Sequence, residues 1–481
     1  MIRILLLEDN YEQSEIIKKM LETEVEVVHV VYLSDVVNIC EDEDSFFDFA
    51  ILDLRIPESI EFLEPKENNG ISAFRLFKQK FPGTPVLILT ASSSNEHFRE
   101  LIGEGTLSNI WGKREVNTVD YLRKSELEEL DTIVKNLIQD INLVDDILLE
   151  SNTDDFDINS LKLKQKRLFS IITHKLNGYI SKVSPVTPGY SGASIFFLDV
   201  QDENRNTITK IIVKIGNAKK ISEEYENYDL HVVSRLDNAN FPPRLSSSKF
   251  GAKDLHSIYY RWLSNDKNMS VFEYINSDTF NEDCFRRIFD LTQGWRQAST
   301  LELKRIGDIR RIFVTDDKLS EISHLYNLGW VENFENRRVQ FNMSVCHGDF
   351  HAGNIFINHE TGTPSVIDYG DIRVAPACYD SIALELGFTY NKESKISDWP
   401  DINSALKWPY SEDYFKDCNQ GEKLSIIREW TLKLTNNNIK EYIAVTYCYL
   451  LKQLCFNDVR QHKLEKTLNI LQGLIACFNK R

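Results

Sequence analysis

The N-terminal third of the chain alternates between short apolar runs and longer stretches with apolar residues at helical spacing. Short continuous apolar runs are typical of buried strands, and the longer stretches are typical of amphipathic helices. This alternation predicts an α/β domain with a doubly wound parallel sheet and helices on both of its faces. The expected strands lie within residues 2–10, 25–33, 48–57 and 84–92, and the expected helices within 11–24 and 70–81.

Four polar residues follow these strands directly: Glu8, Asp9, Asp53 and Thr90. Because the carboxyl ends of parallel strands meet at one edge of a sheet, we expect these side chains to lie close together. Three carboxylates at one edge repel each other, and a divalent cation such as Mg²⁺ would remove that repulsion. Asp53 is then a candidate nucleophile toward a phosphoryl donor, with Thr90 donating a hydrogen bond to the new phosphate.

This set of residues resembles the receiver domain of bacterial response regulators, over residues 1–142. The resemblance implies a five-stranded domain that holds Mg²⁺ through Asp9 and Asp53. It also implies that Asp53 accepts a phosphoryl group from a cognate histidine kinase or another phosphodonor.

The receiver resemblance further implies a lysine after the fifth strand. We expect this lysine to be Lys113, because it follows the apolar run LSNIW. The alternative is Lys124, which lies within residues 119–137, a stretch with the apolar spacing of one long helix.

Residues 143–180 separate this domain from the rest of the chain. Acidic residues dominate the first half of the segment and basic residues the second half. We interpret the segment as a connector that is helical or partly extended.

The next segment, residues 181–264, has the pattern of strands joined by a glycine-containing turn and a polar hairpin. Gly189 and Gly192 lie in that turn, where they would let backbone amides approach a phosphate closely.

Lys214 lies within the apolar run IIVKIG of the same segment. A lysine in a buried strand needs an anionic partner, because burying an unpaired charge is costly. The helical segment that follows offers Glu224, with Glu223 and Glu226 as alternatives. Such a pair would orient the lysine toward the phosphates of ATP.

The segment HGDFHAGN places Asp349 and Asn354 five positions apart, which is the spacing found in the catalytic loops of kinases. At this spacing the aspartate can meet an acceptor hydroxyl while the asparagine reaches Mg²⁺ on the ATP phosphates. The run SVIDYGD then places Asp368 at the end of a strand, after a hairpin, where it would bind Mg²⁺.

These two stretches resemble the group of aminoglycoside phosphotransferases and choline kinases. The group's signature, His-Gly-Asp-x-His-x-x-Asn followed by Ile-Asp-x-x-Asp, is met without a mismatch. The resemblance implies a bilobal kinase-like fold, with an antiparallel-sheet N-lobe at 181–264 and a mostly helical C-lobe at 265–481. It implies that Asp380 holds the catalytic loop.

The resemblance also assigns roles within the candidate site. Asp349 would be the catalytic base, Asn354 and Asp368 the Mg²⁺ ligands, and Lys214 a phosphate contact. His347 and His351 are expected to order the loop rather than bind metal.

Composition narrows the function further. The formal net charge of −17 argues against binding to nucleic acid, whose phosphates would be repelled. No apolar run has the length of a membrane span, and the N-terminus does not have the pattern of a signal peptide. Eight scattered cysteines without a Cys-x-x-Cys pair indicate neither a disulfide framework nor a zinc site. We therefore expect a cytoplasmic protein.

The main hypothesis is an ATP- and Mg²⁺-dependent phosphotransferase that acts on a hydroxyl group of a small molecule or protein and is controlled through Asp53. The alternative is a signalling module that binds a nucleotide or partner without catalysis. A protein kinase is disfavoured, because Gly348 stands where most protein kinases have arginine.

Overall fold

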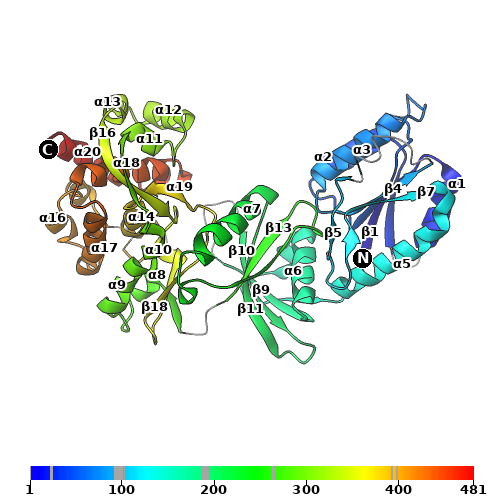
Figure 1. The fold of residues 1–481 in the computed structure, drawn as a ribbon, viewed down its shortest axis with the longest axis horizontal. Coiled ribbons are helices and arrows are strands. Elements are labelled where there is room, and N and C mark those ends of the chain that lie inside the picture. Colours follow the sequence, from blue (N-terminus) through cyan, green and yellow to red (C-terminus); the bar gives the residue numbers. More distant parts are fainter. Residues whose placement is uncertain are drawn as a thin grey trace. The chain divides into compact units, whose positions relative to one another are not determined.

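The computed structural model describes residues 2–21, 25–91, 101, 103–186, 194–262, 267–391, 394–396 and 399–480 (Figure 1). The chain divides into two compact units. The first comprises Met1–Ser222 and Arg244–Trp262, and the second Glu223–Pro243 and Leu263–Arg481. The first unit thus includes the expected receiver domain, the connector and most of the expected N-lobe.

The receiver region contains a five-stranded parallel sheet. Its spatial order is β2 (Val25–Val30), β1 (Ile2–Leu7), β3 (Phe49–Asp53), β4 (Val86–Thr90) and β7 (Val119–Arg123). The order reverses direction after β1, which is the topology of doubly wound sheets with a ligand site at the carboxyl ends of the strands. The predicted fold class of this region is confirmed.

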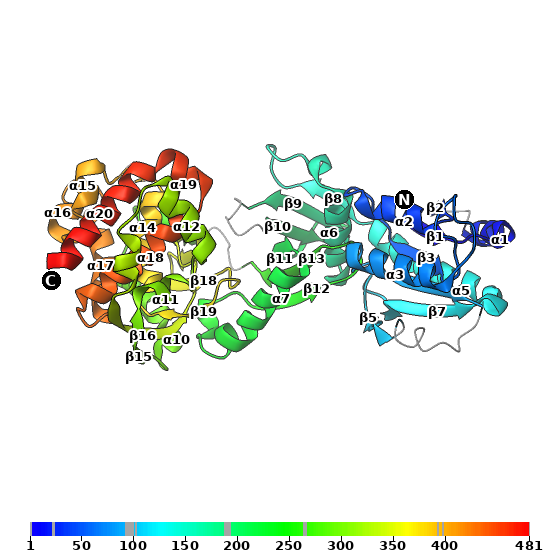
Figure 2. The same cartoon turned by 90° about the horizontal axis from the view of Figure 1, so that it is seen from above.

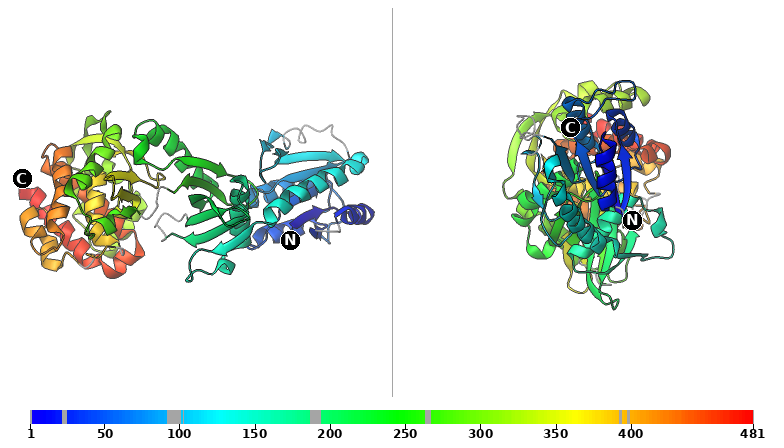
Figure 3. Two further views of the ribbon diagram at one scale, coloured as in Figure 1. Left: turned by 90° about the horizontal axis from the view of Figure 1, so that it is seen from below. Right: turned by 90° about the vertical axis from the view of Figure 1, so that its right-hand side faces the viewer.

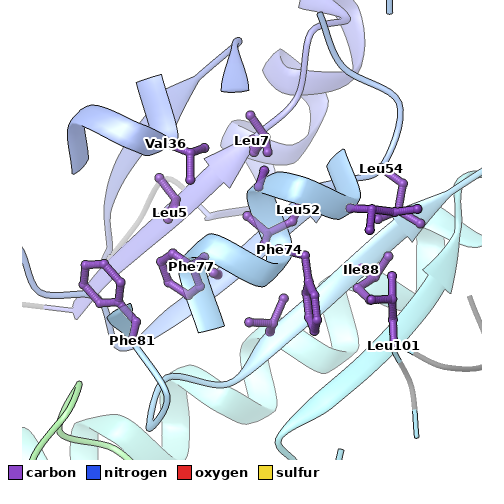
Figure 4. Close-up of a cluster of buried hydrophobic side chains, with 14 of the residues drawn as sticks. Leu5, Leu7, Val36, Leu52, Leu54, Phe74, Phe77, Phe81, Ile88 and Leu101 are labelled. Carbon is purple, nitrogen blue, oxygen red and sulfur yellow. The ribbon is translucent and has the colours of Figure 1, made fainter. Parts of the chain in front are cut away.

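Helices cover both faces of this sheet (Figure 1). On one face, α2 (Leu33–Glu41) and α3 (Glu67–Lys80) pack on a cluster that includes Leu5, Leu52, Phe74 and Phe77 (Figure 4). On the other face, α1 (Tyr11–Leu21) and α5 (Leu127–Asp145) pack on the alternate residues of the same strands. Burial of both faces explains why the inner strands read as continuous apolar runs.

The expectation of one helix over residues 119–137 is wrong. Residues 119–123 form β7, and α5 starts only at Leu127. Strand β7 lies at the edge of the sheet and buries only Val119 and Leu122 completely. Two apolar residues three positions apart fit a helix as well as they fit this strand, so the spacing misled the prediction.

The second sheet of the first unit has six strands. Its order is β12 (Arg244–Ser248), β13 (His256–Arg261), β11 (Thr207–Gly216), β10 (Ser194–Gln201), β9 (Ile180–Pro185) and β8 (Leu148–Ser151). All neighbours are antiparallel except β8 and β9. The predicted antiparallel N-lobe sheet is therefore present, with one parallel strand added at its edge.

That added strand comes from the segment that we interpreted as a helical or partly extended connector. Strand β8 lies within residues 143–180 and extends the N-lobe sheet, and only α6 (Leu163–Lys175) is a long helix in this segment. Helix α6 packs along the sheet (Figure 2). The segment is therefore part of the folded N-lobe.

Helix α6 also contacts the receiver region. Ile171 joins the apolar cluster under α5. Arg167 is buried and pairs with Asp48 at 3.0 Å and with Asp145 at 2.7 Å. Asp48 precedes β3 and accepts a hydrogen bond from the backbone amide of Arg3. One arginine therefore links the amino-terminal edge of the receiver sheet, the end of α5 and the N-lobe.

The second unit contains two small sheets and many helices. The sheets are β14 (Asn268–Ser270) with β17 (Ile355–Asn358) and β18 (Thr363–Val366), and β15 (Thr300–Arg305) with β16 (Arg338–Cys346) and β19 (Arg373–Pro376). The longer helices are α9 (Glu282–Leu291), α12 (Asp316–Leu325), α14 (Tyr379–Tyr390), α17 (Gly421–Leu434), α18 (Ile439–Leu454) and α20 (Leu464–Lys480). The C-terminal helices, orange to red in Figure 3, pack together. The predicted mostly helical C-lobe is confirmed.

The eight cysteines all lie among the described residues and are all free thiols. No helix in the described part of the chain is both long enough and apolar enough to cross a lipid bilayer.

From the ion pairs of Arg167 we predict an effect on the stability of the first unit. Replacing Arg167 with methionine leaves Asp48 buried without its cation, and we expect the free energy of unfolding of the first unit to fall by about 3 kcal/mol. The control is Arg205→Met, which removes an exposed pair with Glu150 and should change stability little. Chemical denaturation followed by circular dichroism measures both. Equal effects of the two substitutions would contradict the prediction.

Candidate functional site

The acidic residues predicted to meet at the edge of the receiver sheet do meet there. One carboxylate oxygen each from Glu8, Asp9 and Asp53 lies within 4.8 Å of the others. Glu8 is fully buried and Asp53 is 2% exposed. Thr90 ends the neighbouring strand β4 and is also buried. The parallel register of β1, β3 and β4 explains this convergence.

The lysine at this cluster is Lys124, and the expectation of Lys113 is corrected. The ammonium of Lys124 lies 2.7 Å from Asp53 Oδ2 and 2.9 Å from Glu8 Oε2. Lys124 directly follows β7, the fifth strand of the sheet. Lys113 comes before the amino-terminal end of that strand, whereas the acidic cluster lies at the carboxyl ends of the strands. Misreading β7 as helix therefore caused the error.

The charges of this cluster depend on one another. Burial raises the pKa of the Asp53 and Glu8 carboxyl groups, and the Lys124 ammonium partly offsets that effect. Burial alone would lower the pKa of Lys124, but the charges of Asp53 and Glu8 raise it. The site thus keeps more acidic charge than one lysine neutralises, which favours the addition of a cation.

The donor set fits Mg²⁺. Mg²⁺ prefers hard oxygen ligands, and three carboxylates with oxygens this close together supply them. The remaining Asp53 oxygen, Oδ1, accepts a hydrogen bond from the backbone amide of Arg55, which fixes the carboxylate orientation.

In the second unit, the predicted catalytic loop is the turn that follows β16. Asp380, near the start of α14, accepts hydrogen bonds from the backbone amides of His347 at 2.8 Å and Gly348 at 3.1 Å. Asp380 is 7% exposed, and burial raises the pKa of its carboxyl group. The loop is therefore attached to α14 by the contact that the family resemblance implied.

Gly348 allows the chain to turn at this point. Its φ is +82°, and a Cβ atom there would lie 2.2 Å from the backbone oxygen of Asp371. Residues with side chains rarely adopt this conformation, and the contact leaves no room for one. Glycine is therefore required by the backbone conformation at this position, where most protein kinases have arginine.

The loop also brings the other predicted residues together. The side-chain amide of Asn354 donates to the backbone oxygen of Asp349 at 2.9 Å, which leaves Asn354 Oδ1 available as an oxygen ligand. The predicted hairpin forms from β17 and β18. The backbone amide of Ile367, beside Asp368, donates to the backbone oxygen of Asn354 at 3.0 Å. An amide oxygen and a carboxylate are both ligands of the kind that Mg²⁺ binds.

The two histidines form hydrogen bonds that hold the loop. His347 is fully buried, and its Nε2 lies 3.0 Å from the backbone oxygen of Ile367. His351 Nδ1 accepts from the backbone amide of Gly353, and its Nε2 lies 3.8 Å from Asp349 Oδ2. Both contacts are of the loop-ordering kind that was expected.

Lys452 is a site residue that the sequence reasoning missed. Its ammonium donates to the backbone oxygen of Gly348 at 3.2 Å and lies 3.7 Å from Asp349 Oδ1. It comes from α18, far along the chain from the loop. A lysine next to the apolar run IAVTYCYLL could have been noticed by the argument that singled out Lys214.

The Asp-Tyr-Gly segment is held by the C-terminal end of α7 (Ala218–Asn227). The side chain of Asn227 donates to the backbone oxygen of Tyr369 at 2.9 Å. Tyr369 is fully buried and stacks edge-on against Tyr228. On α7, Glu224 is buried whereas Glu223 and Glu226 are exposed.

The other predicted nucleotide-binding residues do not all belong to one unit. Lys214 is 6% exposed on β11 of the first unit, whereas Glu224 belongs to the second unit. Their pairing stays a prediction. Gly189 and Gly192 lie outside the described residues.

The position of Lys124 makes the second prediction. Substitution by methionine removes the cation that would pair with phosphate on Asp53, so we expect incorporation of phosphate from a small phosphodonor with Mg²⁺ to fall at least about tenfold. Intact-mass spectrometry measures the incorporation. Lys113→Met is the matched control and should behave like the unmodified protein. A larger loss in the Lys113 variant would show that the assignment to Lys124 is wrong.

Gly348 provides the third prediction. Gly348→Ala forces a side chain into a positive-φ position against backbone, which should lower the free energy of unfolding of the second unit by about 1–3 kcal/mol. The control is Gly329→Ala, where the structure places no atom within 4 Å of a new Cβ. Denaturant titration compares the two variants, and similar stability in both would refute this role of Gly348.

Part of the second unit matches a known protein family. Residues 279–386 match the family model described as "Phosphotransferase enzyme family". The match includes Asp349, Asn354, Asp368 and Asp380. No curated protein matches the chain.

Several solved structures are similar to parts of the chain. The ethanolamine kinase of Plasmodium vivax is 11% identical, with 73% of this chain and 96% of that chain covered, at a TM-score of 0.38. An amicoumacin kinase in complex with AMP-PNP and Ca²⁺ is 11% identical, with 62% and 88% covered, at a TM-score of 0.33.

The receiver domain of a sensor histidine kinase from Pseudomonas aeruginosa, with a coordinated magnesium ion, is 26% identical. It covers 28% of this chain and 97% of its own, at a TM-score of 0.21. Residues 279–386 thus match the model of the phosphotransferase enzyme family, and the sheet order and acidic cluster of the first unit resemble those of a receiver domain.

Proposed function

We propose that the protein is an ATP- and Mg²⁺-dependent phosphotransferase that acts on a hydroxyl acceptor and is regulated by phosphorylation of Asp53. The observation that carries the proposal is the arrangement of Asp349, Asn354 and Asp368 on one loop and hairpin, inside the segment that matches the phosphotransferase family. Bound Mg²⁺ and ATP would supply the transferable phosphoryl group and neutralise its charge.

The chain's own residues would perform three tasks. Asn354 Oδ1 and the Asp368 carboxylate would hold the metal. The carboxylate of Asp349, whose side chain is 39% exposed, would accept the proton of an incoming hydroxyl. Lys452 would keep this carboxylate in position while it also contacts the loop backbone. Lys214, on the N-lobe sheet, would contact the phosphates.

Regulation would begin at the receiver cluster. A phosphoryl group on Asp53 would change the partners of Lys124, which now contacts both Asp53 and Glu8. A histidine kinase or a small phosphodonor would supply that group. The acceptor would be a small molecule or a protein with an accessible hydroxyl.

The fourth prediction tests transfer. With ATP and Mg²⁺, a panel of aminoglycosides, amino alcohols and sugars should yield an acceptor whose mass increases by one phosphoryl group. Asp349→Asn should slow this transfer at least about a hundredfold, because a general base is lost, while calorimetry still detects ATP binding. ATP binding without transfer to any acceptor would instead favour the non-catalytic signalling module.

The regulatory part needs its own control. Turnover is compared with and without a small phosphodonor, in unmodified protein and in Asp53→Ala. A response that is present in the first and absent in the second supports regulation. Equal rates in all four conditions would remove the regulatory proposal and leave the phosphotransferase proposal standing.

A further inference from the structure

A polar pocket lies between the receiver region and the N-lobe, within the first unit and apart from both candidate phosphate sites. Its volume is about 420 Å³, which is within the range of small-molecule sites. One wall is the receiver loop that includes Ser108, Asn109 and Gly112. The other consists of β12, the residues that follow it and the end of α6.

The lining has a pronounced chemical bias. It contains two lysines, Lys175 and Lys249, together with hydroxyl and amide groups, and no carboxylate. The polar residues are Ser108, Asn109, Ser246, Ser247 and Ser248. In a chain with a formal net charge of −17, a pocket with only positive charge in its lining is unusual. Lysine, hydroxyl and amide groups are the donors that bind phosphate oxygens.

Lys175 supplies an independent observation. Among the described residues, its ammonium forms no ion pair or hydrogen bond. Burial lowers its pKa to about 8, with no nearby charge that offsets the effect. An anion in the pocket would stabilise the charged lysine, because an unpaired buried charge is costly.

The acidic side chains nearest to this region do not serve as its partners. Asp140 pairs with Arg114 at 2.8 Å, and Asp254 pairs with Lys164 at 2.7 Å. The side-chain oxygen of Asn109 accepts from the backbone amide of Gly112, so its NH₂ group remains as a donor. The pocket therefore retains hydrogen-bond donors that no acceptor of its own lining satisfies.

The walls also leave space around the donors. Gly112 has a φ of +98°, and a Cβ there would lie 2.7 Å from the ring of His174 and 3.5 Å from Lys175 Cγ. Glycine thus lets the receiver loop approach the end of α6 closely. Ile110 and Phe250 add apolar surface. A lone phosphate ion would fill only part of the volume, so the pocket fits an anion that carries an organic group.

We infer that this pocket binds a small phosphate monoester, with Lys175 and Lys249 holding the phosphate and the serine and asparagine groups donating to its oxygens. A ligand in this place contacts the receiver loop and the N-lobe strand together. Its binding therefore strengthens the attachment of the receiver region to the N-lobe.

Calorimetry with the full chain tests the inference, with ribose 5-phosphate and inorganic pyrophosphate as probes. EDTA is present so that metal-dependent phosphate sites do not contribute. We expect binding that weakens at least tenfold in Lys175→Glu/Lys249→Glu and is unchanged in Lys166→Glu, a control on the same helix outside the pocket. Ribose, which lacks the phosphate, should give no heat. Equal affinity in the double variant, or equal affinity for ribose, would overturn the inference.

A second measurement needs no substitution. Acetylation of lysines by an amine-reactive reagent, followed by peptide mass spectrometry, reports the access to each ammonium group. Ribose 5-phosphate or pyrophosphate should slow the modification of Lys175 and Lys249 at least threefold and leave Lys166 unaffected. Acetate at the same concentration should not protect them. No protection by either phosphate compound, or equal protection by acetate, would overturn the assignment to a phosphate monoester.

Discussion

The structure depends on the balance of charge at buried positions. The receiver cluster places Glu8 and Asp53 out of solvent, and the contact of Lys124 with both carboxylates offsets much of the cost of burying them. Arg167 does the same for Asp48 beneath the sheet. The pocket beside α6 has the opposite imbalance, an excess of positive charge. Its Lys175 is partly buried, and burial lowers the pKa of the ammonium group. Each imbalance indicates which charge a ligand would bring.

At the predicted catalytic loop, backbone geometry decides which residues the positions can hold. Asp380 accepts two amides of the loop, and Gly348 adopts the conformation that lets both point toward it. The turn then leads into Asp349 and Asn354, whose mutual hydrogen bond fixes the asparagine oxygen. The sequence signature of the loop is thus a set of conformational requirements as much as a set of reactive groups.

The sequence predicted the positions of site residues where a simple rule of sheet topology brings them together. Glu8, Asp53 and Thr90 were predictable because parallel strands end at one edge. Lys124 was not, because an edge strand with two buried residues has no pattern distinct from a helix. Strand β8 was missed for a related reason: its neighbour β9 comes after a whole helix, and pairing between distant segments leaves no local signal. Lys452 likewise meets Asp349 only through the tertiary fold, and the two pocket lysines come together only through that fold.

The arrangement of the first unit limits how a signal from Asp53 could travel. Asp53 lies at the carboxyl end of β3, whereas Asp48, at the other end of the same strand, pairs with Arg167 of α6. Gly83, just before β4, exchanges backbone hydrogen bonds with Lys253 and Gly251 of the N-lobe. The receiver region is therefore attached by the edge opposite to its acidic cluster. A change at Asp53 must pass through the length of the sheet or along α5, whose last residue, Asp145, also pairs with Arg167. Both routes lead to the Arg167 guanidinium, which joins the receiver region to the N-lobe together with the backbone hydrogen bonds of Gly83.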